Sequence, residues 1–176
     1  MSDSPAARIR RLTPADWAVL REVRIAALTD APEAFGSTLD RELGFTEAVW
    51  RGRLRDDAQR GYVQLVAMRG DDQAGTIGLI RSDEQSDIAQ MVSMWVSPDA
   101  RGSGIGDLLV QAVIDTARDA GYVGIHLWVA EGNGYAEQLY ARNGFVRTGA
   151  VQPIRADEPD RLEFAMKTDL AASSLL

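Results

Sequence analysis

A glycine-rich stretch near the middle of the chain has the residue types and spacing to bind a phosphate group. Residues 101–106 are Arg-Gly-Ser-Gly-Ile-Gly, between an apolar run at 91–96 and an amphipathic segment that begins near Gly104. Glycine permits a positive φ and lets a ligand approach the main chain without meeting a Cβ. Backbone N–H groups at a helix start converge on an anion, and the helix dipole adds to the attraction. The sequence therefore predicts an anion-binding loop between a buried strand, which Pro98 ends, and a helix.

Three kinds of phosphate-binding loop compete for this stretch, and the spacing separates them. A Walker loop requires Gly-Lys-Ser/Thr, but Gly104 precedes isoleucine, and the only lysine of the chain is Lys167. A dinucleotide fingerprint requires glycine at the position of Asp107. The remaining pattern, Arg101, two residues, Gly104, one residue and Gly106, resembles the pyrophosphate loop of the GNAT superfamily of acyl-CoA-dependent N-acyltransferases. A plain glycine-rich turn that caps a core helix is the alternative.

A second block of residues, further along the chain, also resembles this superfamily. In the superfamily, the same residue types follow a strand at the same intervals. In this chain they are Asn133, Ala136, Leu139, Tyr140, Gly144 and Phe145. Two blocks in the correct order, one helix and one strand apart, rarely arise by chance. The chain is therefore identified as a member of the GNAT superfamily, on a resemblance that covers residues 89–148.

Composition and charge exclude several other classes. Cysteine is absent and His126 is the only histidine, which excludes disulfides, a cysteine nucleophile and a multi-histidine metal site. A net charge of −7 without a basic block argues against nucleic acid and anionic membranes as partners. No apolar run approaches the ~20 residues of a membrane span, and the N-terminus has no apolar signal core. We expect a soluble, cytoplasmic protein with one domain, residues 1–170, and a C-terminal tail, 171–176.

The periodicity of the apolar residues predicts the elements that position these motifs. Strands are expected at 8–12, 62–68, 75–81, 89–96, 124–129, 145–147 and 160–167, and helices at 13–28, 46–58, 104–120 and 133–143. The strand at 124–129 follows the central strand through a helix, so the two should be parallel. The arginine-rich helix at 46–58 is interleaved with acids and is typical of a solvated surface. Residues 29–41 are either a cover over the acceptor side or a surface connection.

The resemblance implies a fold of the α/β (α+β) class. It consists of a mixed, mostly antiparallel sheet of about seven strands with helices on both faces, in which the central parallel pair of strands splays apart. The pantetheine arm of the co-substrate, acetyl-CoA, lies between these two strands in the superfamily. The implied cofactor-binding residues are Met94, Trp95 and Val96 through their backbone, the N–H groups of Arg101, Gly102, Ser103, Gly104, Ile105 and Gly106, and Asn133 and Tyr140.

The resemblance also implies the reaction, which is direct attack of an amine on the thioester in a ternary complex. A backbone N–H near Val96 would hold the oxyanion, and no metal is involved. Cysteine and a Gly-x-Ser-x-Gly elbow are both absent, which leaves no usual nucleophile for an acyl-enzyme. The acceptor stays open between a small amine, an amino acid, an antibiotic and a peptide N-terminus, and so does a homodimer. A non-catalytic acyl-CoA-binding or sensing module is the alternative function.

The acid and the base of the reaction differ in how well the sequence defines them. By resemblance Tyr140 is the general acid that protonates the departing thiolate, and a core tyrosine is the alternative. Gln90 stands where some members have a glutamate base, and an amide takes no proton at neutral pH. Glu131 and Glu84 remain as candidate bases, directly or through water, although surface carboxylates are usually only solvated. A lone strand histidine such as His126 is more typical of a structural residue.

Overall fold

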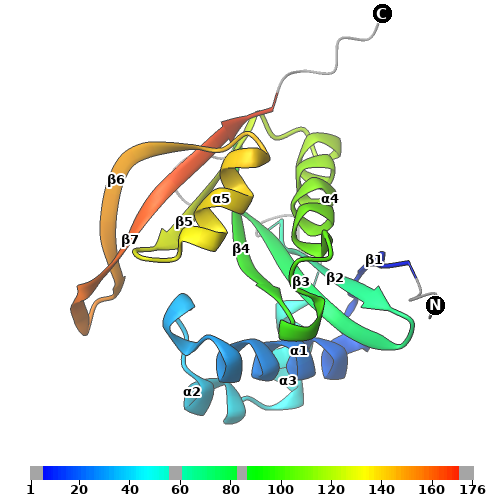
Figure 1. The fold of residues 1–176 in the computed structure, drawn as a ribbon. Coiled ribbons are helices and arrows are strands. Elements are labelled where there is room, and N and C mark those ends of the chain that lie inside the picture. The colour runs from blue at the N-terminus through cyan, green and yellow to red at the C-terminus, as the bar shows by residue number, and fades with distance from the viewer. Residues whose placement is uncertain (1–5, 56–60, 83–86, 171–176) are drawn as a thin grey trace, which may run out of the picture.

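The computed structural model describes residues 6–55, 61–82 and 87–170, which form a seven-stranded sheet with helices on both faces (Figure 1). The strand order is β1-β2-β3-β4-β5-β7-β6, and every neighbouring pair is antiparallel except β4 and β5, which are parallel. This confirms the predicted fold class. The strands are β1 (Arg8–Arg11), β2 (Val63–Arg69), β3 (Asp72–Arg81), β4 (Ile88–Val96), β5 (Gly124–Ala130), β6 (Val146–Arg155) and β7 (Glu158–Asp169).

The helices form two layers, one against each face of the sheet (Figure 1). On one face lie α4 (Ile105–Asp119) and α5 (Gly134–Arg142), and on the other lie α1 (Trp17–Asp30), α2 (Leu39–Leu43) and α3 (Glu47–Arg53). Short 3₁₀ turns occupy η1 (Pro14–Asp16), η2 (Pro32–Ala34) and η3 (Pro98–Ala100). The largest core cluster lies between α4 and the sheet, where Leu109, Val110 and Val113 are fully buried. None of the helices in the described residues is long and apolar enough to cross a membrane.

Capping contacts confirm the helix starts predicted at Thr13 and Asn133 and the helix ends predicted before Gly121 and Gly144. The Thr13 N–H donates to Asp16 Oδ2 at 2.9 Å, as a capping box requires. Asn133 Oδ1 accepts from the Ala136 N–H at 3.2 Å at the start of α5. Gly121 and Gly144, which follow α4 and α5, have φ values of 82° and 91°. Short local signals therefore fix where these helices begin and end.

The strand predicted at 75–81 begins earlier, at Asp72 of β3, and three other predicted elements also had the wrong length. The strand predicted at 145–147 runs as β6 over Val146–Arg155, and the strand predicted at 160–167 is β7, Glu158–Asp169. These two strands form one long hairpin, and β6 is an edge strand whose residues are almost all exposed, so it has no apolar alternation to reveal it. The helix predicted at 46–58 ends at Arg53, and residues 56–60 lie outside the described part of the chain.

The two parallel strands diverge soon after they begin to pair. Their pairing extends only from Ile88–Gly124 to Gln90–His126, which confirms the predicted splay. A β-bulge follows at once in β4: Gly78 of β3 is opposite Val92, but Thr76 is opposite Trp95, so β4 has one residue more than β3 in this interval. The bulge contains Ser93, whose φ of 57° is the only positive value of a non-glycine residue in the ranges described.

Candidate active site

The loop before α4 has an accessible main chain with free N–H groups. Gly102 and Gly104 have φ values of 73° and 83°, and a Cβ added to either would meet no atom within 4 Å. Among the described residues, no backbone carbonyl accepts from the N–H groups of residues 102–106, because the first helical bond runs from the Leu108 N–H to the Gly104 carbonyl at 3.0 Å. Five consecutive donors therefore remain available at the positive end of a helix, a suitable geometry for a phosphate.

The predicted loop residue Arg101 differs from its neighbours. Its N–H donates to the Pro98 carbonyl at 3.3 Å, and its Nε donates to the Val96 carbonyl at 3.1 Å. Its Nη2 pairs with Asp30 at the end of α1, and the Trp95 Nε1 donates to the same carboxylate at 2.9 Å. The Arg101 side chain thus joins the loop to β4 and α1.

A cation that the sequence analysis missed lies beside the loop. Arg69, at the end of β2, donates from Nη2 to Ser103 Oγ at 2.9 Å, and Ser103 Oγ donates to the Ala100 carbonyl at 2.5 Å. Arg69 and Ser103 are 34 positions apart in the chain, so no local pattern connects them. The sheet thus brings a positive charge next to the loop.

The backbone at the end of β4 presents polar groups toward the diverging strand β5. The Ser97 N–H donates to the Ala74 carbonyl at 3.0 Å, so the next pair, Gly75 and Val96, is a non-hydrogen-bonded one. The N–H and carbonyl of Val96 therefore point away from β3. The Val96 carbonyl accepts a hydrogen bond from Arg101, so the Val96 N–H is the group that remains available on the side of β5.

The side chains of the same segment divide between the two faces of the sheet. Met94 and Val96 pack against the core beneath α4, whereas Trp95 packs against α1 and is 8% exposed. The side chains of Met94 and Trp95 therefore contribute to the core. Binding of acetyl-CoA by the backbone of residues 94–96 stays a separate prediction.

The two sequence blocks that resemble the superfamily are in direct contact. A Cβ on Gly106 would lie 3.2 Å from Leu139 Cδ2, so this glycine permits the close approach of α5 to α4. Arg142 of α5 donates to both carboxylate oxygens of Asp107 at 2.7 and 2.8 Å, and Asn143 Nδ2 donates to the same carboxylate at 2.8 Å. These hydrogen bonds lower the pKa of Asp107 to about 2, and the bond from Arg142 contributes most. The loop before α4 and the helix that carries Tyr140 thus form one unit.

Tyr140 lies inside this unit, on the buried side of α5. Its ring packs edge to face on Phe145, with centroids 5.9 Å apart, and the residue is 6% exposed. Burial raises the pKa of its phenol above the ordinary value of 10, so the hydroxyl stays protonated at neutral pH. The environment suits both a core tyrosine and a proton donor.

The candidate bases lie in different places. Glu131 follows β5, is exposed, and interacts electrostatically with Arg147, whose guanidinium carbon is 3.8 Å from the centroid of the Phe164 ring. Because Phe164 belongs to the core beneath α4 and α5, we place Glu131 on that side of the sheet. Glu84 lies outside the described residues. Gln90 occupies the last position at which β4 pairs with β5, opposite His126.

A second carboxylate, Glu163, was missed by the sequence analysis. It lies opposite Ala130 at the end of β5, and its neighbour Phe164 faces the α4 side, so Glu163 faces the side of α1 and α2. Gln152 Nε2 donates to it at 2.8 Å, and burial raises its pKa. A half-buried carboxylate without an ion pair among the described residues therefore lies on the face opposite Glu131.

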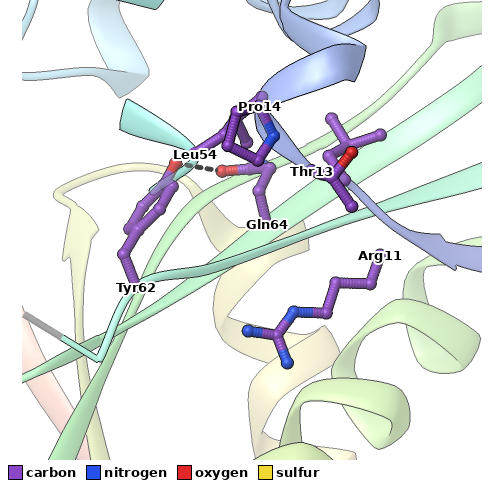
Figure 2. A pocket seen from close by; sticks show the side chains of 7 residues that line it. Arg11, Thr13, Pro14, Leu54, Tyr62 and Gln64 are labelled. Atoms are coloured by element: carbon purple, nitrogen blue, oxygen red, sulfur yellow. Dashed lines mark hydrogen bonds between the residues drawn. The ribbon is translucent and has the colours of Figure 1, made fainter. Parts of the chain in front are cut away.

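Two hollows of the structure lie away from this site. One, of about 90 Å³, is bordered by residues after β1 and by Tyr62, whose hydroxyl donates to Gln64 Oε1 (Figure 2). The other, of about 500 Å³, lies by Thr116 and Asp119, at the end of α4 opposite to Gly104. Neither is lined by residues of the loop.

Comparison with known proteins defines the family. The model of the Acetyltransferase (GNAT) family matches residues 20–145, so the chain belongs to this family. It is 31% identical to an IAA acetyltransferase of Azospirillum brasilense over 84% of this chain and 95% of that one. It is 32% identical to an aminoglycoside N(6')-acetyltransferase of Stenotrophomonas maltophilia over 66% of this chain and 71% of that one. The chain spans 29% and 45% of the length of its relatives from Methanocaldococcus jannaschii and rat.

Solved structures show the same fold. Spermidine N-acetyltransferase of Vibrio cholerae, in complex with CoA and spermine, superposes with a TM-score of 0.74 over 94% of this chain and 96% of that one. The sequences are 19% identical, so this likeness bears on the fold alone.

Proposed function

We propose that residues 1–170 act as one domain that transfers an acetyl group from acetyl-CoA to a primary amine. The observation that supports this most directly is the row of five free N–H donors at 102–106, beside two parallel strands that diverge. A plain helix-capping turn explains the glycines but not the divergence of β4 and β5 next to them. Membership of the GNAT family supplies the chemistry, which is N-acetylation.

In this proposal acetyl-CoA supplies a thioester as the electrophile, and the residues of the chain bind and orient it. The N–H groups of residues 102–106 bind the pyrophosphate, and Arg69 adds a positive charge beside Ser103. The Val96 N–H, which points toward the diverging strand, donates to the thioester oxygen. Met94 and Trp95 hold the same strand in place through their side chains, and Asn133 lies at the start of α5 on the other side of the arm.

Proton transfer completes the proposal. Tyr140 donates a proton to the departing sulfur, for which its phenol is in the correct protonation state. For the base, Glu131 acts directly or through water, and Glu163 is the rival because it is half-buried and faces the opposite side of the sheet. Parallel pH–rate profiles of Glu131→Gln and Glu163→Gln decide between them, since only loss of the base removes the acidic limb.

The acceptor is tested with a panel of amines. The similar proteins are described as acting on IAA, aminoglycoside and spermidine, so the panel contains polyamines and aminoglycosides, together with amino acids and short peptides with free N-termini. The assay measures release of free coenzyme A and detects the acetylated amine by mass spectrometry. We expect stoichiometric coenzyme release with at least one amine. Acetyl-CoA binding without transfer to any amine would favour the non-catalytic sensor instead.

The transfer should not pass through a covalent acetyl-protein, because the chain has no cysteine. Initial-rate patterns should show that both substrates bind before product leaves. An acetylated protein that forms with acetyl-CoA alone, and then passes its acetyl group to an amine, would contradict this mechanism.

A further inference from the structure

A buried ion pair between α1 and α2 contacts the bulge of β4. Arg24 of α1 is 5% exposed, and Glu42 of α2 is 0% exposed. Arg24 donates to both carboxylate oxygens, from Nε at 3.1 Å and from Nη2 at 2.5 Å. Its third nitrogen, Nη1, lies 3.4 Å from Ser93 Oγ, and its guanidinium carbon lies 5.1 Å from the centroid of the Phe35 ring. Four segments of the chain thus meet around one guanidinium.

Stability alone explains this arrangement poorly. Removing two charges from water costs free energy, and apolar residues in the place of a buried pair are often neutral or stabilising. Ser93 is also in an unfavourable conformation, because a positive φ in a residue other than glycine persists only where the surroundings impose it. Arg24 is the side chain that contacts Ser93 from the facing helix, so it is in place to impose this conformation.

The bulge lies where the direction of β4 matters for the proposed reaction. Gln90 is the last residue of β4 that pairs with β5, and Val96 carries the free N–H. Ser93 lies between them, and a bulge bends the strand and redirects the residues that follow. A change in the conformation of Ser93 therefore moves the Val96 N–H.

We infer that Arg24, held by Glu42, is a positioning residue that fixes the Ser93 bulge and thereby the backbone donor of Val96. This inference rests on the proposed acetyl transfer. Arg24 acts through the backbone of β4 and is not assigned any contact with substrate.

The first test removes both buried charges. Arg53, whose Nη1 lies 3.4 Å from Glu42 Oε2, also loses a partner, but its side chain is partly exposed and stays in contact with water. In the double variant Arg24→Met/Glu42→Leu, both charged groups are replaced by apolar ones. We expect a folded protein with acetyl-CoA affinity within about twofold of wild type, because the loop at 101–106 is untouched. The kcat should fall at least about tenfold, since a misplacement of about 1 Å can cost about 10²-fold.

The second test substitutes Ser93, and its result distinguishes a positioning role of Arg24 from a merely structural one. Ser93→Gly and Ser93→Val both remove the hydroxyl, but only glycine adopts a positive φ readily. We expect Ser93→Gly to keep kcat within about threefold and Ser93→Val to lose at least about tenfold. Ser93→Gly added to the double variant should restore most of the lost kcat. If the double variant does not fold, Arg24→Lys takes its place in the same comparison. Lysine keeps the charge but lacks the planar guanidinium that donates to both oxygens of Glu42.

Two outcomes would overturn the inference: a wild-type kcat without the ion pair, or a loss of kcat that Ser93→Gly does not restore. Hydrogen exchange separates failure of the inference from failure of the proposed function. If wild type acetylates no amine, the proposed transfer is wrong, and the amides of residues 92–96 still report on the bulge. Faster exchange there in the double variant, with β2 unchanged, supports a positioning role for Arg24. Unchanged exchange at 92–96 contradicts it.

Discussion

The loop before α4, at residues 101–106, and the sheet face toward α1 and α2 are built by different means. The loop presents five neighbouring N–H groups, and two of its glycines are surrounded by open space. The opposite face depends on side chains from distant segments, such as Arg24, Glu42 and Glu163. A site made from contiguous backbone leaves a short pattern in the sequence. A site made from side chains that meet only after folding leaves none.

A role that depends on one side chain should be lost with a single atom, and Tyr140, which lies on the α4 side next to the loop, offers the clearest case. Tyr140→Phe deletes one hydroxyl and keeps the ring that packs on Phe145. If Tyr140 is the acid, kcat should fall by about 10²-fold or more, with little change in acetyl-CoA affinity or stability. Tyr135→Phe, on the same helix but 91% exposed, is the matched control and should leave kcat unchanged. An unchanged kcat in Tyr140→Phe, with chemistry shown to limit the rate, would make Tyr140 a core residue only.

Binding by the loop backbone, by contrast, should tolerate loss of one neighbouring side chain. Arg69→Gln removes the charge beside Ser103 and keeps a hydrogen-bond donor. We expect the Kd for acetyl-CoA to rise about five- to tenfold, because one charge-assisted contact is lost while the backbone donors remain. The effect should shrink at high salt. Arg118→Gln, far along α4, is the control, and an equal change in both variants would contradict a role for Arg69.

The smallest effect concerns the contact between α4 and α5. The pKa of Asp107 is lowered to about 2, chiefly by the hydrogen bond from Arg142, so the ionised form favours folding. This contribution is complete above the unfolded pKa of about 3.9 and is lost as the pH falls toward about 2. Asp107→Asn should lower the unfolding free energy at pH 7 by less than about 1 kcal/mol, because the pair is exposed to solvent. Denaturant titrations at pH 7 and pH 2.5 measure this, and a difference that grows at low pH would contradict it.

The sequence predicted the loop, its flanking strand and helix, and the ends of α4 and α5, because each depends on residues within a few positions. It did not predict the length of β6, whose hydrogen bonds come from pairing with β7 and not from an apolar pattern. It also missed Arg69, since its contact with Ser103 joins segments that only the sheet brings together. The positive φ of Ser93 had no sequence signal, because serine ordinarily avoids that conformation.

The central claim is that the backbone at 102–106 binds acetyl-CoA, and two glycines at opposite ends of α4 allow a matched test. Gly104 and Gly121 have φ values of 83° and 82° and equally open surroundings, so valine at either position imposes a similar strain. The measurement is the unfolding free energy of wild type, Gly104→Val and Gly121→Val with and without acetyl-CoA. At about a hundred times the wild-type Kd, wild type and Gly121→Val should each gain roughly 2.7 kcal/mol, whereas folded Gly104→Val should gain nothing. No gain in folded, ligand-free wild type, or an equal gain in Gly104→Val, would contradict the claim.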